Sequence, residues 1–168
     1  MHQNLAARGA AGILQPCLPA LLAESYGKVG RAEEGLTVLA EAFAVMDKTG
    51  ECEHEAEMYR LAGELSLRNG ESETGRTGDK KIFPDSPILR FSVSSPEECF
   101  WKAIEIARKQ QAKSLELRAV MSLSRLWQSQ GKKEEARQML AEIYGWFTEG
   151  FDTKDLQESK ALLEELER

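Results

Sequence analysis

The segment from Gly70 to Thr77 comes closest to a catalytic motif in this sequence. It reads GESETGRT and matches the phosphate-binding loop GxxxxGK[ST], except that Arg76 stands where that loop has lysine. A phosphate-binding loop needs a preceding strand and a following helix whose N-terminus faces the phosphates. Here a helical pattern precedes the segment and GDKKIFPDSP follows it. We therefore expect neither a nucleotide site nor a bound cofactor.

His54 is the histidine best placed to act as a base or a metal ligand. It lies in ECEHEAE, beside Cys52 and several glutamates, and on a helix it would share a face with Glu57. We interpret the cluster as a solvated acidic first turn, because carboxylates are stabilised at the positive end of a helix. No serine or cysteine is placed with both a base and an orienting acid, so we expect no catalytic and no metal-binding residues.

The composition is that of one soluble globular domain. The 168 residues are 42% hydrophobic and 30% charged, and 22 basic against 28 acidic side chains give a net charge of -6. That balance argues against nucleic acid as a partner. Cys17, Cys52 and Cys99 are too few for a disulfide framework and are expected to be buried free thiols in a reducing cytosol. No apolar run reaches the roughly 18 residues of a membrane span, so we expect a cytoplasmic protein without membrane contact.

Helical periodicity organises the chain into hairpins. Residues 113–148 form two amphipathic segments that meet across Gly131, and residues 16–49 repeat this arrangement across Gly30. A shift of 101 residues superposes the two hairpins and aligns large with large and small with small side chains. The aligned pairs are Leu22 with Leu123, Tyr26 with Trp127, Glu34 with Glu135, Leu39 with Leu140, Ala40 with Ala141 and Phe43 with Tyr144.

The middle hairpin, residues 53–111, is expected to contain a long loop over residues 70–95. Glycines and prolines crowd that loop, although its ILRFSV segment could form a short extended stretch. Ser95 and Glu98 then predict a capping box, with Pro96 at the first helical position. Residues 152–167 predict a terminal capping helix with Asp152 as its N-cap. Residues 1–15 are less patterned and could be the remnant of a preceding helix.

The tryptophans are interpreted as packing residues and not as ligand boxes. Trp127 and Tyr144 occupy core positions of the last hairpin by periodicity. Trp146 and Phe147 are expected to pack that hairpin against the capping helix.

The spacing of Leu22, Ala23, Tyr26, Gly35, Leu39 and Ala42 resembles the large and small positions of tetratricopeptide repeats, and Leu123, Ser124, Trp127, Ala136, Leu140 and Ile143 resemble them again. The unit is longer, about 39 residues against about 34. Segments such as LLAESYGKVGRAEEGLTVLAEAF and ARKQQAKSLELRAVMSLSRLWQSQGK are also similar to the C-terminal repeat region of bacterial multidomain signalling ATPases, which often follows nucleotide-cyclase and ATPase domains. The resemblance implies an all-α superhelix of hairpins and a non-catalytic role.

In tetratricopeptide stacks the first helices of the hairpins line the concave surface. By register this surface would expose Glu24, Lys28, Tyr59, Arg60, Arg118, Arg125 and Gln128 as candidate partner-binding residues. The first hypothesis is a non-enzymatic scaffold that binds a protein or peptide. The alternative is a regulatory or sensor segment that binds a small ligand or docks on a cyclase or ATPase domain. Homo-oligomerisation through an uncapped N-terminal repeat face stays open as a third.

Overall fold

A computed structural model describes residues 17–50, 53–73 and 95–168, and every regular element among them is an α-helix. The predicted all-α fold class is confirmed. In chain order the helices are α2 (Cys17–Lys28), α3 (Ala32–Thr49), α4 (Glu55–Glu73), α6 (Pro96–Lys109), α7 (Lys113–Ser129), α8 (Lys133–Tyr144) and α9 (Lys154–Leu166). None of these helices is both long enough and apolar enough to cross a membrane.

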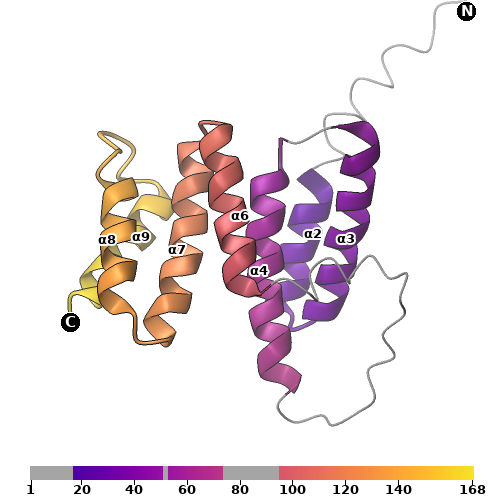
Figure 1. The fold of residues 1–168 in the computed structure, drawn as a ribbon, viewed down its shortest axis with the longest axis horizontal. Helices are drawn as coiled ribbons and strands as arrows, with labels where there is room; N and C mark the ends of the chain where they lie inside the picture. The colour runs from indigo at the N-terminus through magenta and orange to yellow at the C-terminus, as the bar shows by residue number, and fades with distance from the viewer. Residues whose placement is uncertain (1–16, 51–52, 74–94) are drawn as a thin grey trace, which may run out of the picture.

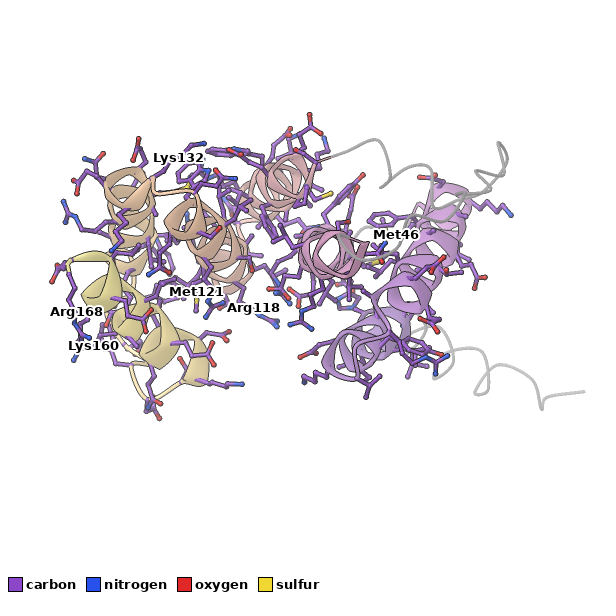
Figure 2. All side chains as sticks on the ribbon, turned by 90° about the horizontal axis from the view of Figure 1, so that it is seen from below. Met46, Arg118, Met121, Lys132, Lys160 and Arg168 are labelled. Carbon is purple, nitrogen blue, oxygen red and sulfur yellow. The ribbon has the colours of Figure 1, made fainter. Side chains whose placement is uncertain are left out.

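The helices are arranged as successive antiparallel neighbours. They follow one another along the long axis of the molecule, from α2 and α3 at one end to α8 and α9 at the other (Figure 1). Each helix packs on the next in sequence, and in addition α2 contacts α4, α4 contacts α7, and α7 contacts α9. Helices α2, α4, α7 and α9 therefore form one continuous layer, and α3, α6 and α8 lie on one side of it (Figure 2).

The two hairpin turns that the 101-residue shift aligns have the same geometry. Gly30 and Gly131 have φ angles of 77° and 81°, in the left-handed region that glycine adopts without strain. In the first turn the N–H of Arg31 donates to the carbonyl of Tyr26 at 2.9 Å, and in the second Lys132 donates to Trp127 at 2.9 Å. The same cations lie over the same rings, 5.0 Å and 5.9 Å from the ring centroids. The shift therefore aligns contacts as well as residue types.

Helix α6 begins with the predicted capping box. The Ser95 hydroxyl accepts from the Glu98 N–H at 3.1 Å, the Glu98 carboxylate accepts from the Ser95 N–H at 2.7 Å, and Pro96 is the first helical residue. The N-cap predicted for α9 is wrong by one residue. Thr153 takes that position because its N–H and hydroxyl both donate to the Gly150 carbonyl, which closes a turn before the helix starts.

Helix α4 continues past the point where the loop was predicted to begin. Gly70 is helical and the helix ends at Glu73, so the expectation of a loop from residue 70 is wrong for residues 70–73. A glycine in a helix costs only about 1 kcal/mol, which is too little to end it by itself. The rest of the predicted loop and the ILRFSV segment lie outside the described residues. The first four residues of GESETGRT are thus part of a helix, which a phosphate-binding loop could not be.

The hydrophobic core runs between the two layers and along the stack. Phe43, Phe100, Leu123 and Leu140 are among its fully buried side chains. Trp127, Tyr144 and Phe147 pack against the core cluster of the last helices, as predicted.

Trp146 does not pack the last hairpin against α9, so that prediction is wrong. Its side chain is exposed and meets Phe147 edge-on, with the Lys113 ammonium 5.7 Å from its ring centroid. Phe151, in the turn before α9, packs on Tyr144 of α8, with ring centroids 5.9 Å apart.

Candidate partner-binding surface

The residues predicted for the concave surface come from three helices of the α2–α4–α7–α9 layer. Those of α2 and α7 are at least partly exposed, whereas the two of α4 are packed against other helices. Glu24 and Lys28 lie on α2, where they form an ion pair of 2.9 Å, and Lys28 is largely exposed. Arg125 is exposed and Gln128 half-buried on α7. Arg118 of α7 is half-buried, and it projects on the side of the layer opposite to Lys132 (Figure 2).

Arg60 is buried, so its predicted exposure is wrong. Its guanidinium forms a bidentate pair with Glu57, with N–O distances of 2.9 Å and 2.7 Å, and also donates to Glu64 on the next turn of α4. The hydroxyl of Ser122 on α7 donates to the same Glu64 at 2.8 Å. Among the described residues no buried side-chain nitrogen or oxygen lacks a hydrogen-bond partner. Arg60 is therefore a buried member of a polar network between α4 and α7, in which Glu57 and Glu64 stay partly exposed.

Tyr59 is also placed differently from the prediction. Its ring is half-buried and lies 4.7 Å from that of Phe43 on α3, and it touches all three core clusters. Tyr59 thus joins α4 to the opposite layer and does not project from the α2–α4–α7–α9 layer. Tyr59 is therefore a packing residue.

Ion pairs on this surface link side chains of different helices. Arg118 lies 3.0 Å from Glu57 of α4 and 3.9 Å from Asp155 of α9, and Arg125 lies 3.3 Å from Glu158 of α9. The pKa of Glu24 is lowered, chiefly by the hydrogen bond from Lys28, although burial opposes this shift. The charge of Lys28 and the more distant charges of Arg118 and Arg60 lower it further. The field of α4 and α7 therefore reaches α2.

The charge of Arg60 is maintained by its neighbours. Burial, the largest single effect, lowers its pKa, but the hydrogen bond to Glu57 and the charges of Glu57, Glu64 and Glu24 outweigh burial and leave the pKa raised. The spacing of Glu57, Arg60 and Glu64, three and four residues apart on one helix, was the sequence signal for this network. Only the packing of α7 over it determines that the network is buried.

Glu116 forms a second buried ion cluster that sequence reasoning missed. Its carboxylate accepts from Arg108 of α6 at 2.6 Å and from Lys113 at 2.7 Å, and Glu116 is buried at the α6–α7 junction. Burial raises the pKa of Glu116, but the two hydrogen bonds and the charges of Lys113 and Arg108 outweigh it, so the pKa lies below its usual value. The cluster ties the middle hairpin to the last one.

We expect Glu116→Gln to destabilise the protein at neutral pH and to have little effect in acid. A folded-state pKa below the unfolded value gives stability that is complete above the unfolded pKa and lost as pH falls through the folded pKa. Urea unfolding of both proteins at about pH 7 and about pH 3 measures this difference. As a control, Glu105→Gln removes an exposed carboxylate of α6 from two lysine pairs, and any effect there should disappear in high salt. Equal stability of Glu116→Gln and wild type at neutral pH would contradict the assignment.

The remaining chemical candidates gain no support as sites. The described residues contain no group of three or more histidine, cysteine, aspartate or glutamate side chains placed to hold a metal, and Cys52 beside His54 lies outside them. Cys99 is buried as predicted, and burial raises the pKa of its thiol to about 11, which suits a core residue better than a nucleophile. The side chains of Cys17 and Cys52 are not described.

Comparison with protein-family models, with curated proteins and with solved structures finds no match to this chain in any of the three.

Proposed function

We propose that this chain is a non-catalytic scaffold that binds a protein or peptide on the exposed side of the α2–α4–α7–α9 layer. One observation carries the proposal: four helices far apart in sequence place their charged side chains on one continuous surface. A surface assembled from several helices suits an extended partner, because each helix can contribute one contact to it.

The finer architecture belongs to the same proposal. We infer that the hairpins form a tetratricopeptide-like superhelix, and the matching turn geometry at Gly30 and Gly131 supports this. The resemblance to the C-terminal repeat region of bacterial signalling ATPases supports a role in signalling. Under this proposal α9 caps the array, with Leu156, Leu162 and Leu166 turned into the core.

The partner segment that fits this surface best is acidic. Arg118 and Arg125 are two turns apart on α7, or about 10.5 Å along the helix axis. Each reaches a carboxylate of α9, at 3.9 Å and 3.3 Å, while remaining partly exposed to water. Pairs of this kind contribute about 0–1 kcal/mol, so a partner carboxylate can replace Asp155 or Glu158 at little cost. Lys28 on α2 supplies a further cation at the other edge of the surface.

Photo-crosslinking tests the proposal. A crosslinker at Gln128, on the proposed surface, should capture a discrete partner in the cells that express the protein, and one at the exposed Gln138 of α8 should not. We expect R118Q/R125Q to weaken binding of the captured partner by about tenfold, or about 1.4 kcal/mol. The matched control K133Q/R137Q removes two positive charges from α8 and should leave binding unchanged. The proposal is wrong if no captured protein depends on Arg118 and Arg125.

A further inference from the structure

Helix α2 exposes a row of large apolar side chains at one end of the stack. Leu18, Leu21 and Leu22 of α2 are 58%, 59% and 47% exposed, and Val29, the first residue after the helix, is 68% exposed. Single exposed apolar residues are normal on a protein surface, whereas several on one helix mark a surface made for contact. This row, called the α2 face below, adjoins the surface proposed to bind a peptide at Glu24 and Lys28, but none of its four apolar residues belongs to that surface.

The 101-residue shift between the two hairpins identifies the positions on α7 that are equivalent to the α2 face. The 101-residue shift aligns Leu18, Leu21 and Leu22 with Ala119, Ser122 and Leu123 of α7, which are 1%, 4% and 0% exposed. On α7 the preceding hairpin packs against these positions: Ser122 donates to Glu64 of α4 at 2.8 Å, and Ala119 and Leu123 lie in one buried cluster with Phe100 of α6. At these positions, then, a first helix receives the hairpin stacked before it. On α2 they are leucines that face solvent.

We propose that the α2 face is a self-association site, on which the α2 face of a second copy of this chain packs in a two-fold symmetric dimer. The face is apolar enough to be buried without leaving polar groups unsatisfied. Ser25, within the row, already donates its hydroxyl to the Leu21 carbonyl at 2.8 Å, and Glu24 and Lys28 at its edge neutralise each other at 2.9 Å. No net charge at this edge repels a second copy.

The opposite end of the stack does not fit the α2 face. Charged side chains lie on the outer side of α9 and at its C-terminal end, where Lys160 of α9 and Arg168, just after it, point away from the other helices (Figure 2). Stacking α2 on α9 would bury those charges against leucines, which is unfavourable. Such head-to-tail stacking would also continue without closing, whereas α2 on α2 stops at two copies.

The dimer should be weak and concentration-dependent. Helix α2 has 12 residues and is about 18 Å long, so one face of it offers less contact than the roughly 1,200 Å² that stable complexes bury in total. Apolar burial drives the association, and a charge placed on the face should abolish it.

Sedimentation equilibrium of the full chain over a range of concentrations tests the proposal. The average mass of wild type should rise with concentration and level off at two chains. We expect Leu22→Glu to raise the dimer dissociation constant at least tenfold, while Ala161→Glu, which adds the same charge to exposed α9, leaves it unchanged. Leu21→Ser, which installs the residue that α7 carries at the equivalent position, should weaken the dimer while keeping α2 helical by circular dichroism.

Three results would overturn the proposal. The first is a wild-type protein that stays monomeric at every concentration. The second is a mass that grows beyond two chains, which indicates open stacking. The third is a dimer that Ala161→Glu weakens as much as Leu22→Glu does, or that neither Leu22→Glu nor Leu21→Ser weakens.

Discussion

Phe100→Ala is expected to lower the free energy of unfolding by about 3–5 kcal/mol, because it removes a fully buried ring from the contact between α4 and α6. The loss should be near the upper end of that range, since Gly63 of α4 lies directly against the ring and its backbone cannot fill the space. A Cβ added at Gly63 would lie 2.6 Å from Cε1 of Phe100. Urea unfolding followed by circular dichroism measures the change.

Gly63→Ala tests the same contact from the other side. The new methyl group overlaps the ring, and overpacking of this kind costs about 1–3 kcal/mol. In the double variant G63A/F100A the methyl group enters the space that the ring has left. The stability losses of the two single variants should therefore sum to more than the loss measured for the double variant, with a coupling of about 1–2 kcal/mol.

Gly70→Ala is the matched control on the same helix. A Cβ there meets nothing within 4 Å, and Gly70 lies inside α4 near its C-terminal end. Alanine is a better helix former than glycine, so this variant should be as stable as wild type or more stable by up to about 1 kcal/mol. If Gly63→Ala behaves like Gly70→Ala, the close approach of α4 and α6 is not as described.

The features that sequence predicted well are those that depend on neighbouring residues. The turns at Gly30 and Gly131 follow from a left-handed residue between two helical patterns, and the capping box at Ser95 follows from Ser, Pro and Glu within four positions. A start displaced by one residue, as at Asp152 and Thr153, is the usual error of such local reasoning.

The predictions that failed depend on packing between segments distant in sequence. Periodicity places Arg60 beside the apolar stripe of α4, but only α7, some sixty residues later, determines that it is covered. The exposure of the α2 face has the same origin. Leu22 carries the core pattern of Leu123, yet no described helix stacks on it as α4 and α6 stack on α7.

Arg60→Met is expected to lower the free energy of unfolding by about 2–4 kcal/mol. Methionine keeps most of the volume but leaves the carboxylates of Glu57 and Glu64 together without the cation between them, and breaking a buried ion pair from one side typically costs 3–5 kcal/mol. The loss expected here is smaller than that typical cost, because Arg118 still reaches Glu57 at 3.0 Å and Ser122 still donates to Glu64 at 2.8 Å. Arg137→Met, which breaks an exposed pair with Glu134 on α8, should change stability little.

The triple variant E57Q/R60M/E64Q separates unpaired charge from lost packing. If the destabilisation arises from the stranded carboxylates, making them neutral amides should recover much of the stability lost in Arg60→Met. A triple variant no more stable than Arg60→Met would show instead that the packing of the arginine side chain dominates.

Binding gives a second and independent readout. Because Arg60 is buried between α4 and α7, Arg60→Met should leave partner affinity unchanged under conditions where the variant remains folded. R118Q/R125Q should instead weaken binding, with a smaller effect on stability.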